Sequence, residues 1–504
     1  MPTMDARLRA VCDMIVPEVR EYSGLHEYDG MVQDLSPDGV RAALRRLGGD
    51  PLDDPHDEAH LSAFENALRF QFGELELHRR NPLVHLGNLD LSSYDREYAP
   101  AEERAAAKRR HLAGWPDAVD AAIAALDAVS APVAEALLPA IKGLAAGLDA
   151  EAGETEAAAL RAHERLVQHV ARAAREGDPS PALGAANLAR LMGVAEATEV
   201  DLGRLAERAD AERDRIMAIL TEACARLDPD RKPAELIPEL LRDHPDIEGV
   251  LQEARQQTAE AIAFSRERQL APYLDGECLV GPAPESRSWA MAMMCWSAPE
   301  EPDGPSWYYV TPPDPSWPAE EIEEWLSVFS RTTLPAITVH EVAPGHFAHG
   351  RALRRAATPV RRILHSMTFC EGWAHYVEEV CLEEGFRAGD PRFAVGFCVE
   401  ALIRVTRLAC AIGLHTGAMD VAEATQRFMR DAFLARKGAA SEAQRGTFDP
   451  TYGRYTWGKL AILDLREQAK ARWGAGFSLQ RFHRAMLDLG SPPIGLLGTA
   501  LERG

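Results

Sequence analysis

The sequence predicts a mainly α-helical protein, a large multi-helix bowl or bundle with one small β-hairpin. Two observations support this prediction. Apolar residues recur at helical spacing through most of the 504 residues, among Ala, Leu, Arg and Glu, which are strong helix formers. The exception is a stretch at about 275–312, where Gly and Pro surround runs rich in aromatic residues. Hydrophobic residues make up 46% of the chain, which is enough for a sizeable core.

The first half of the chain consists of amphipathic segments divided by turns. Turn-forming sequences include Ser-Pro-Asp-Gly at 36–39 and Asp-Pro-Asp at 228–230. The Ala-rich stretch 119–176 keeps a helical period, which favours packed helices over a low-complexity linker. We therefore expect a helical N-terminal region over 1–274, with helices near 3–20, 37–47, 56–80, 100–112, 116–148, 151–176, 194–226 and 246–272.

The second region, residues 275–504, continues the same helical architecture after the predicted hairpin. The hairpin strands are expected within 288–296 and at 306–310. Pro318 followed by acidic residues is typical of a helix start. Further helices are expected near 331–356, 361–384, 392–414, 420–437, 455–474, 478–488 and 493–502.

Charge and cysteine content exclude several classes of protein. The net charge of −23 argues against nucleic-acid binding, because that needs a Lys- and Arg-rich face. The eight cysteines form no CxxC pair, which is typical of reduced residues in a reducing compartment. The N-terminal residues show no apolar signal core, and no window approaches 18 uninterrupted apolar residues. We expect a cytoplasmic protein that binds neither nucleic acid nor membrane.

A motif at residues 340–346, His-Glu-Val-Ala-Pro-Gly-His, predicts a metal centre. About thirty residues later, Glu371 begins the sequence Glu-Gly-Trp-Ala-His-Tyr on the next predicted helix. Two imidazoles and a carboxylate are protein ligands of a catalytic zinc that keeps a position open for water. A glutamate directly after the first histidine can act as general base. We predict one zinc per chain, bound by His340, His346 and Glu371, with Glu341 as base and later proton donor to the leaving amine.

The spacing of the two histidines differs from that of the common zinc helix, in which they lie at i and i+4. In a regular helix, position i+6 lies about 240° round and about 9 Å along the axis, so His340 and His346 could not face one ion. Pro344 and Gly345 lie between them. Because proline removes a backbone amide and glycine relaxes the backbone, we expect a break or bulge that absorbs the two extra residues.

Three neighbouring residues have alternative roles. His349 lies three residues after His346 and is a rival ligand, although a supporting or surface position is favoured. Glu378 and Glu379 are expected on a solvated helix face. Glu378 nevertheless lies about two turns after Glu371 and could orient a ligand histidine.

These motifs resemble those of a bacterial family, domain-of-unknown-function family 885, whose pattern is HExxPGHH followed by EGWAxYxE. Three later segments are also similar to this family: 407–415, 449–459 with the Leu-Arg pair at 465–466, and 477–490. The likeness covers roughly 275–503 at the level of motifs. The family is itself similar to helical zinc peptidases of the glutamate-ligand (gluzincin) type, including thermostable carboxypeptidases.

The resemblance implies a zinc-dependent hydrolase of peptide or peptide-like amide bonds, in a gluzincin-like fold with the hairpin near the active site. It also implies that Tyr455 hydrogen-bonds the developing oxyanion, with His415 as a second donor. Two positions depart from the family pattern. Phe347 replaces the second histidine of Pro-Gly-His-His, and Ala411 replaces an aspartate, which removes a support for His415.

Some alternatives stay open. Arg407, Arg454 and Lys459 could each bind a substrate carboxylate, although ordinary salt bridges are favoured. The hairpin could pair with an extended substrate or only close the bundle. Two other functions compete with the hydrolase: a zinc-dependent non-hydrolytic lyase or tailoring enzyme acting on a small molecule, and a non-catalytic helical scaffold. The retained histidines and glutamates of the motif argue against the scaffold.

Overall fold

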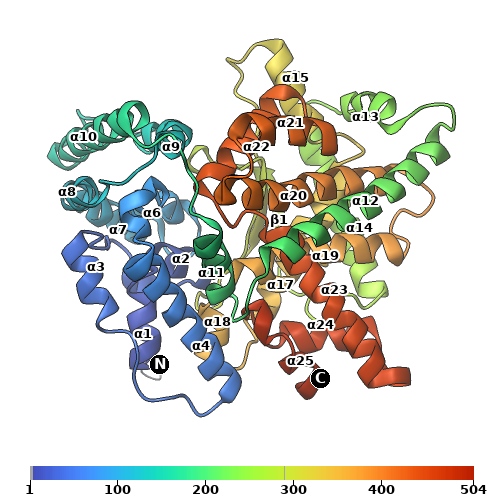
Figure 1. The fold of residues 1–504 in the computed structure, drawn as a ribbon, viewed down its shortest axis with the longest axis horizontal. Coiled ribbons are helices and arrows are strands. Elements are labelled where there is room, and N and C mark those ends of the chain that lie inside the picture. Colours follow the sequence, from blue (N-terminus) through green and yellow to red (C-terminus); the bar gives the residue numbers. More distant parts are fainter. Residues whose placement is uncertain (1–3, 289) are drawn as a thin grey trace.

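The computed structural model describes residues 4–288 and 290–504 and confirms a mainly α-helical fold with one small sheet. The N-terminal helices lie on one side of the molecule, and most of the later helices lie on the other (Figure 1). The described ends of the chain lie on the same side of the molecule in this view.

Most predicted helices of the first half are present, and several are divided. The segment predicted at 116–148 forms two helices because Pro132 starts a second one, and the segment at 194–226 is divided before Asp201, whose side chain caps a new helix. The helices are α1 (Ala6–Cys12), α2 (Val16–Glu18), α3 (Pro37–Leu44), α4 (Pro55–Leu68), α5 (Leu77–Arg80), α6 (Pro82–Leu89), α7 (Ala101–Ala113), α8 (Trp115–Ala125), α9 (Ala131–Gly143), α10 (Glu154–Glu176), α11 (Ala185–Ala195), α12 (Leu202–Leu227), α13 (Pro233–Arg242) and α14 (Ile247–Glu267).

The second half contains the longest apolar helices. They are α15 (Ala319–Ser327), α16 (Leu334–Glu341), α17 (His346–Leu353), α18 (Pro359–Ile363), α19 (Met367–Glu383), α20 (Arg392–Thr416), α21 (Val421–Asp431), α22 (Arg436–Phe448), α23 (Arg454–Trp473), α24 (Leu479–Leu487) and α25 (Thr499–Arg503). Three helices were not expected from the sequence, α6, α13 and α22, and α11 overlaps the predicted segment 194–226 only at residues 194–195. Helix α6 is short, α13 contains Pro238, and α22 begins without a side-chain cap, so their local signals are weak.

The sheet has three strands, β1 (Cys278–Pro282), β2 (Ala292–Cys295) and β3 (Ser306–Val310), in the order β1-β3-β2. Strands β2 and β3 pair antiparallel, as the predicted hairpin requires, and β1 adds a parallel strand that was not predicted. Residue 289, inside the predicted strand 288–296, lies outside the described residues. Tyr308 and Val310 of β3 are buried in one apolar cluster with residues of α14 and α16, so the sheet packs beside the first histidine helix.

Hydrophobic clusters join the two predicted regions across residue 274. One cluster packs Leu220 of α12 with Phe397 of α20, and another packs Leu61 of α4 with Leu364 after α18. Each region therefore completes part of the core of the other.

Helices α19 and α23 cross in backbone contact. A β-carbon on Gly372 would lie 2.5 Å from the α-carbon of Gly458, and a β-carbon on Gly458 would lie 2.1 Å from the carbonyl oxygen of Thr368. Only glycine allows this approach, and it brings together the helices that carry Glu371 and Tyr455.

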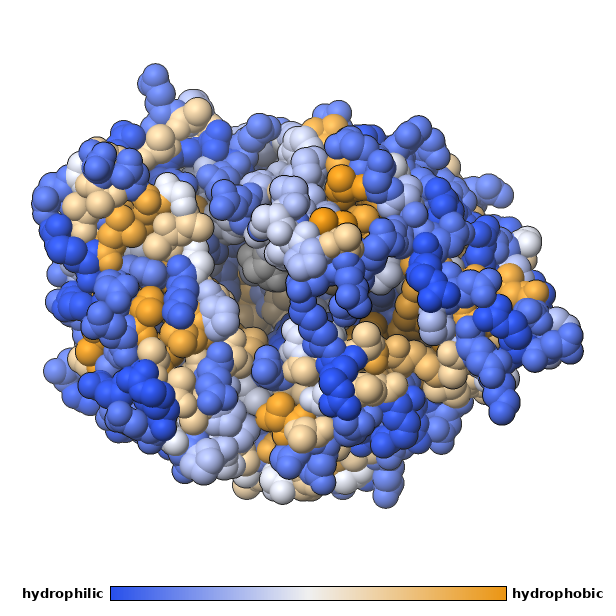
Figure 2. Space-filling model, turned by 90° about the horizontal axis from the view of Figure 1, so that it is seen from above, coloured by the Kyte–Doolittle hydropathy of each residue, from blue (hydrophilic) through white to orange (hydrophobic). Residues whose placement is uncertain are grey.

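Within the described residues, no helix is long and apolar enough to cross a membrane. Seen from above, the surface is mostly hydrophilic, with apolar residues in scattered groups and a hollow near its middle (Figure 2). All eight cysteines are free, and seven of them are buried.

Candidate metal centre

The predicted helix at 331–356 is broken between Glu341, where α16 ends, and His346, where α17 begins. The amide of Gly345 donates to the carbonyl of Val339, which makes a turn wider than a helical one. A β-carbon on Gly345 would lie 1.8 Å from the His340 carbonyl oxygen, so glycine is required there. Trp373 of α19 fixes the loop because its indole N–H donates to the Pro344 carbonyl oxygen at 3.0 Å.

The break brings three predicted ligands together. Nε2 of His340 lies 3.5 Å from Oε2 of Glu371, and Nε2 of His346 lies 3.4 Å from the same oxygen. The three ligand atoms all lie within 4.8 Å of one another. Burial alone would raise the pKa of Glu371, but the two imidazoles hold it well below its usual range, so this carboxylate is ionised at neutral pH.

The two nitrogen–oxygen distances, 3.5 and 3.4 Å, match the donor geometry of a small metal ion. With metal–ligand bonds of about 2.0–2.2 Å, neighbouring ligands of a tetrahedral zinc are about 3.3–3.6 Å apart. Within the described part of the chain, Oε2 of Glu371 is buried and has no hydrogen-bond partner. Because a buried carboxylate oxygen is costly without a partner, the donor set fits a cation at this position.

Glu378 binds the ring nitrogen of His340 that does not face Glu371. Nδ1 of His340 donates to Oε1 of Glu378 at 2.5 Å, which leaves Nε2 free to face Glu371. The other oxygen of Glu378 accepts from Arg404 at 3.0 Å and lies 3.2 Å from Nδ1 of His375. The prediction of a solvated position is therefore wrong for Glu378, which is fully buried, while its alternative role as the orienting carboxylate agrees with this geometry.

Glu379 is also buried, and a solvated position is wrong for it as well. Its carboxylate pairs with Arg215 at 2.7 Å and with Lys459 at 2.5 Å. The two adjacent glutamates thus serve different partners, because successive residues of a helix point about 100° apart.

Replacing Glu378 with glutamine is expected to weaken zinc affinity about 10- to 100-fold, since an amide orients and polarises the imidazole of His340 less well than a carboxylate. The measurement is competition for zinc against a chromophoric chelator. Glu379→Gln is the matched control, because Glu379 is also buried, at 7% exposure, but pairs with Lys459 and not with His340. Equal zinc affinities for the two variants would contradict the role of Glu378.

His349 does not join the ligand set. Its Nε2 lies 2.9 Å from the hydroxyl of Ser491, and its ring is fully buried. Burial, with smaller contributions from His346 and His365, lowers the pKa of His349 to about 3, so the ring is neutral. This agrees with the supporting position that the sequence favoured.

Tyr455 and Glu341 are both neighbours of His340, Tyr455 in space and Glu341 in the sequence. The Tyr455 ring centroid is 6.4 Å from that of His340, across from α16. Glu341 is 8% exposed, and its carboxylate forms no hydrogen bond or ion pair within the described residues. Burial, and secondly the charge of Glu341, raise the pKa of the Cys278 thiol to about 12. The Tyr455 ring therefore lies near the candidate metal centre, and Glu341 directly follows one of its residues in the chain.

His415 is not brought to the centre. It lies near the end of α20, and the helix carries it about 16 Å along the axis from Arg404, the residue that contacts Glu378. Its buried Nε2 donates to the carbonyl oxygen of Gly446 at 2.7 Å. The structure thus gives no support to His415 as an oxyanion donor and shows it bound to the main chain of α22.

The three basic residues weighed as carboxylate ligands each have an ionic partner. Arg407 forms two bonds of 2.7 Å with Glu442, Arg454 pairs with Asp449, and Lys459 is buried between Glu212 and Glu379. Two arginines near the centre were missed, Arg404 and Arg445. Arg404 follows Glu400 at helical spacing, but its contact with Glu378 joins two helices and has no local signal.

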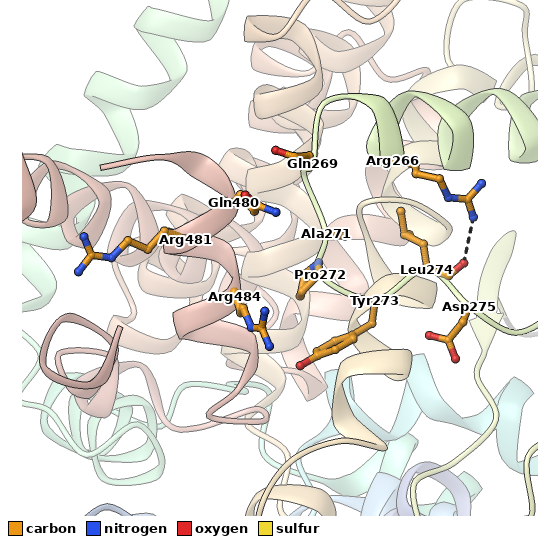
Figure 3. Close-up of a pocket in the computed structure, with 10 residues that line it drawn as sticks. All are labelled: Arg266, Gln269, Ala271, Pro272, Tyr273, Leu274, Asp275, Gln480, Arg481 and Arg484. Atoms are coloured by element: carbon orange, nitrogen blue, oxygen red, sulfur yellow. Dashed lines mark hydrogen bonds between the residues drawn. The ribbon is translucent and has the colours of Figure 1, made fainter. Parts of the chain in front are cut away.

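A surface cavity of about 690 Å³ lies elsewhere in the molecule (Figure 3). It is lined by residues between Arg266 and Asp275 and by the start of α24. Arg266 donates to the carbonyl oxygen of Leu274 at 3.4 Å, and Arg481 points away from the other side chains. None of the predicted site residues lines this cavity.

The family described as "Bacterial protein of unknown function (DUF885)" matches residues 17–501. A solved structure from Shewanella oneidensis, described as a lipoprotein of unknown function, is similar with a TM-score of 0.77 and 20% identity, covering 98% of this chain and 99% of that chain. A lipoprotein structure from Colwellia psychrerythraea is similar with a TM-score of 0.76 and 17% identity, covering 99% of each chain. No curated protein matches. At these identities the two structures show a shared fold alone.

Proposed function

Because the chain belongs to DUF885, a family of bacterial proteins of unknown function, we propose its activity from the geometry of the site: a zinc-dependent hydrolase of peptide or peptide-like amide bonds. The observation that carries this proposal is the approach of two imidazole nitrogens to 3.5 and 3.4 Å from one buried carboxylate oxygen. A set of two nitrogens and one oxygen is typical of catalytic zinc in hydrolases. The glutamate ligand on the following helix supports the gluzincin type.

The chain supplies the acid–base and hydrogen-bonding groups of this reaction. Zinc, when bound, supplies a Lewis acid that activates water and polarises a carbonyl group. Glu341 directly follows His340 and forms no hydrogen bond or ion pair in the described structure, so its carboxylate is available to take a proton from the attacking water and return it to the leaving amine. Glu378 holds the ring of His340 in a single orientation.

Tyr455 provides a hydrogen-bond donor for the oxyanion. Burial, together with the charge of Glu371, raises the pKa of Tyr455, so its hydroxyl keeps its proton at neutral pH. A neutral phenol that is held before the reaction stabilises the developing negative charge. Strand β2 lies at the sheet edge and contacts α16, so its backbone can pair with an extended peptide.

The test is cleavage of a pool of randomised N-acetylated tetrapeptides by the zinc-loaded protein in ¹⁸O-water. Hydrolysis is expected to place one ¹⁸O atom in each new carboxyl group, as read by mass spectrometry. Products without ¹⁸O would indicate elimination or rearrangement instead. If zinc produced no cleavage of any member of the pool, the proposed function would be wrong.

Replacing Tyr455 with phenylalanine is expected to lower kcat about 10²- to 10³-fold with little change in KM, because one oxyanion donor is removed. Steady-state kinetics on a peptide from the pool measures this effect. Tyr452→Phe is the matched control, since the Tyr452 hydroxyl is fully buried without a partner in the described structure. Equal kcat values for the two variants would remove Tyr455 from the mechanism.

A further inference from the structure

Arginine side chains surround Tyr455 on the side facing α20 and α22. The guanidinium carbons of Arg404 and Arg407 lie 5.8 and 5.2 Å from the Tyr455 ring centroid. Arg454 directly precedes Tyr455, and Arg445 lies on α22, three residues after the Glu442 that binds Arg407. In a chain with a net charge of −23, this is a local concentration of positive charge beside the candidate metal centre.

Three of these arginines are committed to carboxylates. Arg404 binds Glu378 at 3.0 Å and Glu400 at 3.4 Å, and Arg407 forms its two bonds with Glu442. Arg454 binds Oδ1 of Asp449. Their guanidinium groups therefore have little capacity for a further anion.

Arg445 is held less closely than Arg407 and Arg454, which also have one ionic partner each. Its contact with Asp449 is 3.3 Å long, and Arg454 already occupies the other oxygen of that carboxylate. The Arg445 side chain is 32% exposed, against 8% for Arg404, 14% for Arg407 and 17% for Arg454. It is thus the most accessible of the four, and it shares one negative charge with a second arginine.

Arg445 also lies beside the segment that carries Tyr455. Its guanidinium group shares the Asp449 carboxylate with Arg454, which directly precedes Tyr455, and its guanidinium carbon lies 6.0 Å from the ring centroid of Tyr452. Because Asp449 lies one helical turn beyond Arg445, it fixes the direction of the guanidinium group while most of its N–H donors stay free.

We propose that Arg445 binds a carboxylate of the substrate, so that the site acts on peptides or amides with a free carboxylate next to the scissile bond. The inference rests on the proposed function for the reaction and adds the substrate class. A guanidinium group presents parallel N–H donors that match the two oxygens of a carboxylate. Tyr455, whose ring centroid lies 6.4 Å from that of His340, would then face the scissile carbonyl group.

The test compares each ligand with its own uncharged form. N-acetylated dipeptides that end in Ala, Phe and Lys are made as free acids and as C-terminal amides, and their binding to zinc-loaded Glu341→Gln protein is measured by calorimetry. The acid is expected to bind about 10- to 100-fold more tightly than the amide for at least one pair, as a charge-assisted bidentate contact provides. In the Glu341→Gln protein, the additional substitution Arg445→Met should remove the preference for the acid while the affinity for the amide stays constant. The substitution Arg445→Lys in its place should keep part of the preference.

Arg430→Met is the matched control, because Arg430 is exposed on α21 and pairs with the adjacent Asp431. It should leave the preference for the acid unchanged. The inference is wrong if acids and amides bind equally or not at all in every pair, or if Arg445→Met keeps the preference. Lack of zinc-dependent cleavage in the peptide pool would instead contradict the proposed function, since the binding comparison needs no turnover.

Discussion

Replacing Glu341 with glutamine is expected to lower kcat at least about 10³-fold, because the amide cannot accept the proton of the attacking water. Zinc content should stay near that of the unchanged protein, since the Glu341 carboxylate is not one of the three grouped ligand residues. The free energy of unfolding should not fall, because the substitution removes a buried charge that has no ionic partner in the described structure.

The measurement combines kcat on a cleaved peptide with zinc content by elemental analysis. Glu320→Gln, at an exposed position of α15, is the control for removal of one negative charge. Full activity in Glu341→Gln would exclude the general-base mechanism. Loss of zinc together with activity would show instead that Glu341 holds the metal.

Replacing His346 with alanine is expected to abolish zinc binding at micromolar metal. This loss of zinc affinity is larger than the loss of about 10- to 100-fold that is expected when a residue that only orients a ligand, such as Glu378, is replaced. The reason is that one of only three protein donors is lost, and the neighbouring Glu371 oxygen then keeps a single nitrogen partner. Activity should fall to background with the metal.

Thermal unfolding with and without zinc measures this loss. Zinc at 100 times its dissociation constant stabilises a native site by about 2.7 kcal/mol, so the unchanged protein should gain stability and His346→Ala should not. His415→Gln is the control, because His415 is a buried histidine that the structure places away from the centre. A zinc-induced gain in His346→Ala equal to that of the unchanged protein would refute the ligand assignment.

Local patterns predicted most of the helices and the break within the histidine motif. Pro344 and Gly345 signal that break because each has a backbone property that no other residue shares. Strand β1 was missed because its parallel partner, β3, lies beyond β2 in the chain, and pairing between non-adjacent segments leaves no local signal. Helix α22 was missed because its polar sequence lacks a cap.

The grouping of His340, His346 and Glu371 could be predicted because all three residues belong to two short motifs. The environment of these residues could not, since it depends on packing between helices. Glu378 looks like a surface residue in the sequence, yet the fold buries it against Arg404 of α20. His415 was assigned by likeness to a family segment, and its partner is the carbonyl group of Gly446. A similar motif predicts which residue type stands at a position, whereas the contacts of that residue depend on how the helices pack.

The contact of Gly372 with Gly458 has a consequence for how this architecture can diversify. One helix carries a candidate metal ligand beside this contact, and the other carries Tyr455 one turn away. At this contact the separation of α19 and α23 is therefore fixed by two main chains and does not depend on the size of neighbouring side chains. Substitutions on the walls can change which molecules enter, while the separation between carboxylate and phenol stays constant. Under the proposed function, the selectivity for substrates could therefore change in evolution while the spacing of the reacting groups stays the same.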